Sequence, residues 1–305
     1  MNRPGRDNTR RNRKIGTEDQ GWRKQSDFVI PDRWDMKSLA WKSYYEKLGP
    51  YIVVERKVHG RPLPIVVEPT KKGYLHPCTP TDIATLLELL PASCTFTIES
   101  IAGIVLRQPT RKQEQIEPVW GRLCYHSTVG PLEGPVIFLE AVGRGTSYSL
   151  PRRQPLAGQA ELRRMEILLS NHRLEKRQHV FDLGPLELRR YVLYHTLIHE
   201  IGHWVDYLTK VVVPSTGPDH GKRLWDKYHQ RPTQEKEAYA HRFSDEWRDE
   251  LIRLGKIPFA RQICRQAMKT EGLDPEWFST GAPEDDAAGP ALGLILPQRR
   301  TPIRP

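Results

Sequence analysis

A five-residue motif in the sequence combines side chains that can bind a metal ion and use it. Residues 199–203 are His-Glu-Ile-Gly-His. Helix positions four apart share a face, so His199 and His203 can converge on one ion, with Glu200 about 100° further round the helix. Zinc lowers the pKa of bound water, and an adjacent carboxylate can take up the proton during attack on a carbonyl. The motif predicts Zn²⁺ bound by His199 and His203, with Glu200 as general base.

The flanking residues favour a functional site, although this short pattern also occurs by chance. Glu200 is the only charged residue between positions 191 and 205. The segment is therefore expected to be a buried helix, in which unpartnered histidines and a carboxylate would be costly. This argues against histidines that merely satisfy core hydrogen bonds.

The long form of the motif resembles that of the zincin metallopeptidases, and the resemblance covers about residues 186–250. Thr196 is the β-branched residue three places before the first histidine, and the flanks are uncharged. The resemblance implies an α+β, zincin-like fold, in which a small mixed sheet lies beside the active-site helix and its edge strand can take an extended peptide. Residues 95–141 are the candidates for this sheet. The implied activity is zinc-dependent hydrolysis of peptide bonds in a protein or peptide substrate.

A catalytic zinc takes three protein ligands and a water, so a third ligand is needed. Glu237, Ala240, Phe243 and Ser244 are similar to the E-x-x-A-x-x-F-A ligand helix of ImmA/IrrE-type peptidases, with Ser244 in place of the usual alanine. This favours Glu237 as the third ligand. The small Ala240 would also let this helix approach the motif helix. Glu235 is the alternative if the register slips.

His220 is the rival third ligand. It begins a segment partly similar to the H-G-K-x-[FW] segment of SprT-like proteases, although Leu224 stands at the aromatic position and Trp225 follows one place late. This alternative implies a protease acting on DNA-bound protein. A third hypothesis is a non-catalytic DNA- or protein-binding module with a structural metal, against which the intact Glu200 argues.

Four more residues near the motif suggest supporting roles. His195 is expected to pack or to line the site, because ligands from three successive turns span too far for one ion. Asp206 could orient His203, or be a surface charge. His241 and Tyr239 are candidates for stabilising an oxyanion.

The spacing of apolar residues places the motif on a long helix over residues 188–208. Pro214, Gly217 and Pro218 break this helix, which leaves His220 in a loop. A second helix is expected from about residue 233 to Gly255, and a last one over 259–270.

The expected β segments lie in the first half of the chain. They cover residues 51–54 and 63–67, which the turn at His59-Gly60 separates, and then 95–107, 119–126 and 135–141. Helices are expected over 81–90 and 156–176. This pattern suggests a small N-terminal α+β subdomain (26–94) and a zincin-like metallopeptidase domain (95–279), between a disordered basic leader (1–25) and a disordered Pro/Gly-rich tail (280–305).

The composition predicts a soluble globular protein. Of 305 residues, 38% are hydrophobic, and half of the formal net charge of +10 lies in residues 1–25. This basic leader predicts at most weak contact with nucleic acid. No run of residues is apolar enough for a signal peptide or for insertion into a membrane. The four cysteines are scattered, which indicates a cytoplasmic protein without a disulfide framework.

Overall fold

The computed structural model describes residues 34–35, 40–41, 44–46, 48–91, 94–110 and 120–279. The expected disordered segments, 1–25 and 280–305, lie outside these residues. Residues 1–42 form one unit, in which the described part is an antiparallel pair, β1 (Trp34–Asp35) and β2 (Ala40–Trp41). All further description concerns the second unit, Ser43–Pro305. It has the expected α+β character, with a small mixed sheet and several helices.

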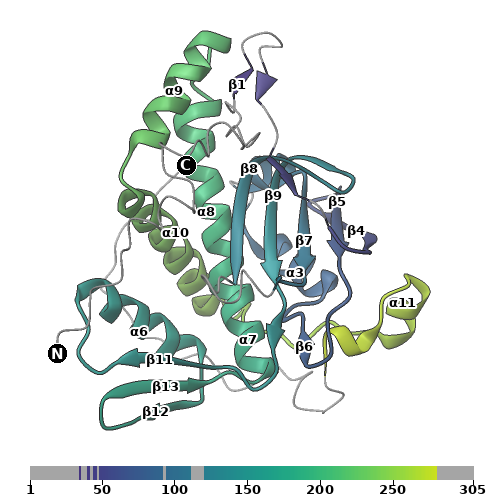
Figure 1. Cartoon of the computed structure of the whole chain (residues 1–305), viewed down its shortest axis with the longest axis vertical. Coiled ribbons are helices and arrows are strands. Elements are labelled where there is room, and N and C mark those ends of the chain that lie inside the picture. Colours follow the sequence, from purple (N-terminus) through teal and green to yellow (C-terminus); the bar gives the residue numbers. More distant parts are fainter. Residues whose placement is uncertain are drawn as a thin grey trace, which may run out of the picture. The chain divides into compact units, whose positions relative to one another are not determined.

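A six-stranded mixed sheet lies beside the helices (Figure 1). Its central strands β9, β7 and β5 are parallel, whereas β8 and β4 run antiparallel to their inner neighbours. The short β3 is parallel to β8 and covers only the end of that strand. In spatial order the strands are β3 (Tyr44–Glu46), β8 (Gly121–Val129), β9 (Leu132–Glu140), β7 (Gly103–Arg107), β5 (Arg61–Val67) and β4 (Ile52–Val58).

The hairpin β4–β5 belongs to this sheet and not to a separate N-terminal sheet. His59 and Gly60 both have positive φ, 51° and 80°, as a two-residue turn between twisted strands requires. Beyond the turn, β5 pairs in parallel with β7, with Ile65 opposite Ile104. The expected boundary at residue 94 therefore falls inside a β-α-β crossover through helix α3 (Pro80–Leu89). The run expected as a strand over 95–107 is also divided, because Thr95–Glu99 forms helix α4.

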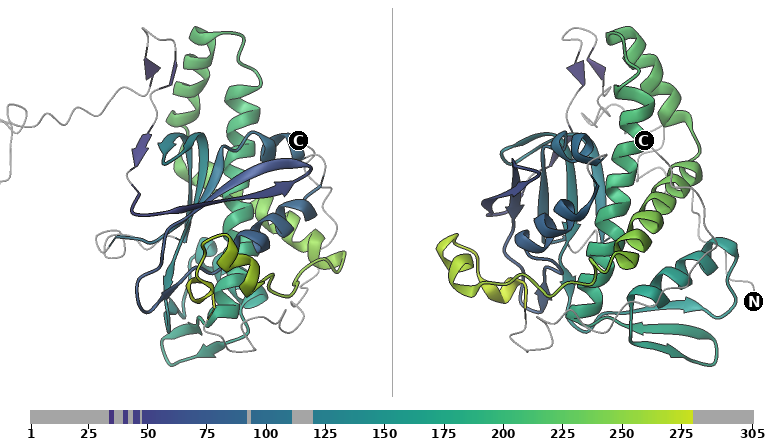
Figure 2. Two further views of the ribbon diagram at one scale, coloured as in Figure 1. Left: turned by 90° about the vertical axis from the view of Figure 1, so that its right-hand side faces the viewer. Right: turned by 180° about the vertical axis from the view of Figure 1, so that it is seen from behind.

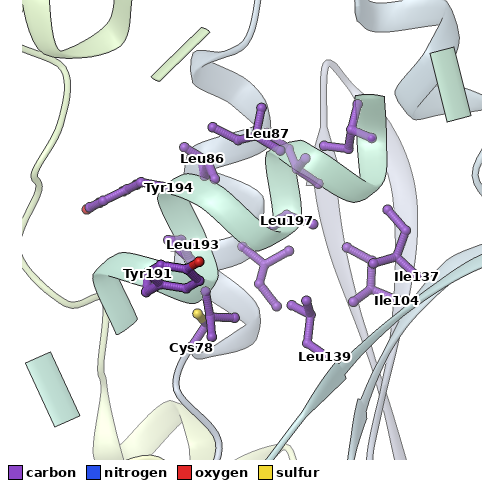
Figure 3. Close-up of a cluster of buried hydrophobic side chains, with 14 of the residues drawn as sticks. Cys78, Leu86, Leu87, Ile104, Ile137, Leu139, Tyr191, Leu193, Tyr194 and Leu197 are labelled. Carbon is purple, nitrogen blue, oxygen red and sulfur yellow. The ribbon is translucent and has the colours of Figure 1, made fainter. Parts of the chain in front are cut away.

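The motif lies on one continuous helical segment, as its apolar spacing predicts. The segment consists of α7 (Pro185–Tyr191), the π-helical η3 (Val192–Leu197), α8 (Ile198–Tyr207) and the π-helical η4 (Leu208–Val212). It runs beside the sheet in all three ribbon views (Figures 1 and 2). Leu193 and Leu197 point into a buried core with Leu86 and Leu87 of α3 and with Ile104, Ile137 and Leu139 of the sheet (Figure 3).

Two further helices follow the motif segment. The second, α10 (Thr233–Arg253), is the predicted ligand helix, and it ends before Gly255, whose φ is +64°. The first, α9 (Pro218–Gln230), was not expected, so His220 lies on a helix and not in a loop. The last expected helix is shorter than predicted, because only Arg265–Thr270 forms α11, before the short 3₁₀ helix η5 (Pro275–Trp277).

A second, three-stranded antiparallel sheet was missed by the sequence analysis. It has the order β11 (Ser147–Pro151), β13 (Gln178–Asp182) and β12 (His172–Leu174). Helix α6 (Leu156–Leu168) adjoins it and ends well before residue 176, the predicted end (Figure 1). A short pair, β6 (Tyr74–Leu75) with β10 (Val142–Gly143), completes the described strands.

A buried ion pair fixes the start of the motif segment. The side chains of Asp82 on α3 and Arg189 on α7 are both fully buried, with a closest N···O distance of 2.9 Å. Burial raises the pKa of Asp82. The charges of Arg189 and Arg261 and the hydrogen bonds from Arg189 and the Gln262 backbone together lower it by more, so the net pKa lies below its usual value. The guanidinium also donates to the carbonyl of Phe259. These contacts join α3, α7 and the segment after α10.

Among the described residues, no helix is long and apolar enough to cross a membrane.

Candidate metal centre

The structure brings the two motif histidines and Glu237 together. The Nε2 atom of His199 lies 3.3 Å from one carboxylate oxygen of Glu237, and the Nε2 atom of His203 lies 3.4 Å from the other. One ligand atom from each residue lies within 4.8 Å of the other two, which is close enough to bind one metal ion. His199 and His203 come from α8 and Glu237 from α10.

Both distances are longer than those of most charge-assisted hydrogen bonds. Charge-assisted N–H···O bonds usually measure about 2.7 to 2.9 Å. Ligands about 2.0 to 2.1 Å from a tetrahedral ion are separated by roughly 3.3 to 3.4 Å. Each separation is close to this edge length, but the two histidines face different oxygens of Glu237, so a carboxylate that binds through one oxygen satisfies only one of the two separations as it stands.

Electrostatics within the cluster keep Glu237 ionised. Hydrogen bonds from His199 and His203 hold the pKa of Glu237 far below its usual range. Burial lowers the pKa of His203, but the hydrogen bond to Glu237 and the nearby charges of Glu200, Glu237 and Asp206 together outweigh burial, so the net pKa is raised. Glu237 is also the accessible member of the group, with 44% of its side chain exposed, compared with 11% and 12% for the histidines. The cluster is thus reachable from solvent on the α10 side.

Glu200 lies beside the ligand set in a different environment. Only 7% of the residue is exposed, and burial is the main cause of its raised pKa. The nearby charges of His199 and His203 and a hydrogen bond from the Leu123 backbone act in the opposite direction. Leu123 belongs to β8, so this carboxylate links the motif helix to the sheet. The contribution of Leu123 was missed because a backbone donor leaves no signal in the side-chain pattern.

Close packing of α8 against α10 sets the distance between the ligands. A Cβ atom built on Gly202 would lie 3.1 Å from both Ala240 Cα and Phe243 Cβ. Such a distance is tighter than most real Cβ contacts, so any side chain at residue 202 would require Ala240 and Phe243 to move by a few tenths of an ångström or more. Ala240 is fully buried at the crossing, in agreement with its expected role.

The other two candidates for the third ligand lie elsewhere. The Nδ1 atom of His220 is 2.9 Å from the Thr216 hydroxyl, at the start of α9. From His203 the helix continues to Val212, a rise of about 14 Å, before the chain turns towards α9. Glu235 is exposed and accepts a long hydrogen bond, 3.5 Å, from Arg231. Neither residue belongs to the cluster of ligand atoms.

His195 and His241 form a second group with His199. Ligand atoms of these three residues also lie within 4.8 Å of one another. The rings of His195 and His241 are stacked, 5.5 Å apart with an interplanar angle of 4°, and the Ser244 hydroxyl lies 3.2 Å from His195 Nδ1. Burial lowers the pKa of His241 to about 3 and that of His195 well below its usual value. His241 is therefore a neutral ring beside His199, with a ring-centroid distance of 4.4 Å.

Asp206 and Tyr239 contact other partners than those considered from the sequence. The Asp206 carboxylate is fully buried and accepts from Arg231 at 2.8 Å and from Lys210. It joins α8 to the α9–α10 connection, so it is not the surface charge considered above.

The Tyr239 ring packs under the cation of Lys210, whose Nζ lies 4.9 Å from the ring centroid. Its suggested role at an oxyanion has no support in these contacts.

Comparison with known proteins adds no assignment. The chain matches no protein-family model, no curated protein and no solved structure. Functional inference therefore depends on the residues of the site.

Proposed function

We propose that this chain is a zinc-dependent peptidase with a zincin-like arrangement, in which His199, His203 and Glu237 hold Zn²⁺. The observation that carries the proposal is that one ligand atom from each of these three residues, two from α8 and one from α10, lies within 4.8 Å of the other two. Two imidazoles and one carboxylate are a usual ligand set for catalytic zinc, which keeps a fourth position for water or substrate. When bound, the ion supplies Lewis acidity and lowers the pKa of water.

Glu200 acts as the general base in this proposal. It flanks the ligands without belonging to their group, and burial raises its pKa from the usual value. A carboxylate with a raised pKa is a better proton acceptor at neutral pH than an exposed one. Glu200 takes a proton from the attacking water and passes it to the leaving amine. The Leu123 backbone holds the carboxylate in place for both transfers.

The outer edge of β8 supports an extended peptide as the substrate class. Trp120 O accepts a hydrogen bond from Glu140 N of β9. In an antiparallel pair every second residue points its backbone N–H and C=O at the partner strand, so the backbone groups of Gly121 and Leu123 point away from β9. Among the described residues, β3 covers this edge only at Ser127 to Val129. The Leu123 N–H is taken by Glu200, so a peptide that adds here as a further strand would pair with the remaining outward groups, the N–H and carbonyl of Gly121 and the carbonyl of Leu123.

A comparison of Glu200→Gln with His199→Ala tests the proposal. Glu200→Gln preserves the size of the side chain but cannot accept the proton, so it should keep zinc and lose hydrolysis of an unfolded protein substrate. His199→Ala should lose both zinc and activity. Zinc content by elemental analysis and cleavage by mass spectrometry are the two measurements. Turnover that persists in Glu200→Gln would exclude its role as base, and unchanged zinc in His199→Ala would exclude the metal site.

The SprT-like alternative has less support. It requires His220 as a ligand, and His220 lies on α9 with Thr216 as its partner. The basic segment that would contact DNA lies outside the described residues. The non-catalytic alternative leaves the position of Glu200 beside the ligand group without a purpose.

A further inference from the structure

A second cluster of metal-binding side chains lies on the three-stranded sheet, on elements that contribute nothing to the site at His199. Glu166 comes from the last turn of α6, His172 from β12 and His179 from β13. One ligand atom from each residue lies within 4.8 Å of the other two. Figure 1 shows α6 next to the three-stranded sheet to which β12 and β13 belong.

Strand register places both histidines on one face of the sheet. His172 is opposite Phe181, and Leu174 is opposite His179. Since alternate residues share a face, these four side chains point to the same side. The ring of His172 stacks between those of Phe181 and His179, at centroid distances of 4.7 and 5.1 Å and angles of 14° and 17°. The imidazoles are therefore held in position by strand pairing and ring stacking.

The separation of the ring nitrogens is close to what an ion requires. His172 Nε2 lies 3.0 Å from His179 Nδ1. Two nitrogens bound to one tetrahedral ion at about 2.0 to 2.1 Å are roughly 3.3 Å apart, so a small shift of one ring is enough. Without an ion, one ring donates to the other across this distance. With an ion bound, both nitrogens use their lone pairs. Glu166 Oε1 lies 3.9 Å from the other ring nitrogen of His172, Nδ1, so the Glu166 side chain would have to turn towards Nε2 to supply the negative charge.

We propose that Glu166, His172 and His179 form a second metal site that binds Zn²⁺ and links α6 to the sheet. The side chains of His172 and Glu166 are 27% and 38% exposed, so an ion can enter from solvent without opening the fold. Solvent supplies the fourth ligand.

The role of this site is structural. The sheet has one three-residue strand and two five-residue strands, and small sheets gain little stability from strand pairing alone. The chain leaves α6 at Leu168 and enters β12 at His172, so an ion held by Glu166 and both strands would cross-link this turn. An ion that binds only the folded state stabilises it by mass action.

Zinc titration by calorimetry in the double variant His199→Ala/His203→Ala tests the proposal independently of the proposed catalytic site. This background should still bind one equivalent of Zn²⁺, and zinc should raise its melting temperature. Adding His172→Ala and His179→Ala should remove both effects. No zinc binding in the double variant, or unchanged binding after the second pair of substitutions, would overturn the proposal.

Two single substitutions in the same background guard against misfolding. Glu166→Gln changes a partly exposed helix residue and should weaken zinc binding roughly tenfold or more, while circular dichroism remains unchanged. Leu174→Ala is the matched control, because this residue faces the same side of the sheet, is 57% exposed and offers no ligand. It should leave zinc affinity unchanged. Equal affinity in Glu166→Gln and Leu174→Ala would remove Glu166 from the site.

Discussion

Glu237 lies between two imidazoles that the motif helix holds one turn apart. Its carboxylate is the ligand that α10 contributes to the proposed metal site. We predict that Glu237→Ala lowers zinc affinity by more than roughly 100-fold. Loss of a residue that only hydrogen-bonds to a metal ligand typically lowers metal affinity by about 10- to 100-fold, and Glu237 is proposed to bind the ion directly. The reason is that His199 and His203 alone leave two coordination positions to solvent. Zinc affinity can be measured by competition with a chromogenic chelator.

His220→Ala is the matched control for Glu237→Ala. His220 is half-buried at the start of α9, and its described partner is Thr216. Its loss should leave zinc affinity unchanged within error. The opposite pattern, in which His220→Ala releases zinc and Glu237→Ala retains it, would assign the third ligand to α9 and favour the SprT-like alternative.

At the scale of elements, the site depends on how closely α8 and α10 cross. Gly202→Val would place a branched side chain where even one Cβ atom lies 3.1 Å from Ala240 and Phe243. Overpacking of this kind typically costs about 1 to 3 kcal/mol, and here it also moves Glu237 away from the histidines. We therefore expect Gly202→Val to lower both the free energy of unfolding and zinc affinity. Chemical denaturation and zinc titration measure the two effects.

A glycine on a different helix provides the comparison. A Cβ atom on Gly158 of α6 would meet the end of the flexible Gln154 side chain, which can move aside. Gly158→Val should therefore leave zinc affinity at the His199 site unchanged, whatever its effect on stability. Equal zinc affinity in both valine variants would show that the α8–α10 crossing does not set the ligand geometry.

The sequence predicts the elements of the site better than their surroundings. Apolar spacing identifies the motif helix and α10, and Ala240 with Phe243 indicates which face of α10 approaches α8. The π-helical turns η3 and η4 leave no such signal, because they differ from an α-helix only in hydrogen-bond register. Helix α9 was missed because Pro218 and Gly221 resemble loop residues, although proline is well tolerated in the first turn of a helix. Strands β12 and β13 were missed because they are short, and because β12 lies within the range 156–176 that was expected to be helical.

At the scale of the whole molecule, long-range pairing was the least predictable feature. Local pattern indicates the β4–β5 hairpin and its turn, but nothing local indicates that Ile65 lies beside Ile104. The same limit applies to the Asp82–Arg189 pair, whose partners are far apart in the chain and fully buried. Residues 26–94 were therefore assigned to a separate subdomain, although β3, β4 and β5 from this range share a sheet with β7, β8 and β9.

The stability of the whole chain should fall in mild acid, with His76 as one cause. His76 is fully buried, its Nε2 donates to the Glu68 carbonyl at 2.7 Å, and Nδ1 has no hydrogen-bond partner among the described residues. Burial lowers the pKa of His76 from 6.5 to about 4, against a smaller opposing effect of the Glu68 hydrogen bond. Between these two values the unfolded chain binds a proton that the folded chain does not. The free energy of unfolding must therefore decrease as pH falls from 6.5 towards 4.

His76→Gln isolates this contribution. Glutamine can still donate to the Glu68 carbonyl but does not titrate, so the variant should lack up to about 3 kcal/mol of the acid-induced loss of stability. At pH 7.5 it should be less stable than the parent chain, because the packing of the ring on Phe278, at 5.5 Å, is lost. Denaturant unfolding at several pH values from 7.5 to 4.5 gives the dependence of the free energy of unfolding on pH for the parent chain and for His76→Gln. His220→Gln is the control at a half-buried histidine. If His76→Gln loses stability in acid as steeply as the parent chain and the control, the pKa of His76 does not differ between the folded and unfolded states. The acid sensitivity must then arise from other buried groups such as His195 and His241.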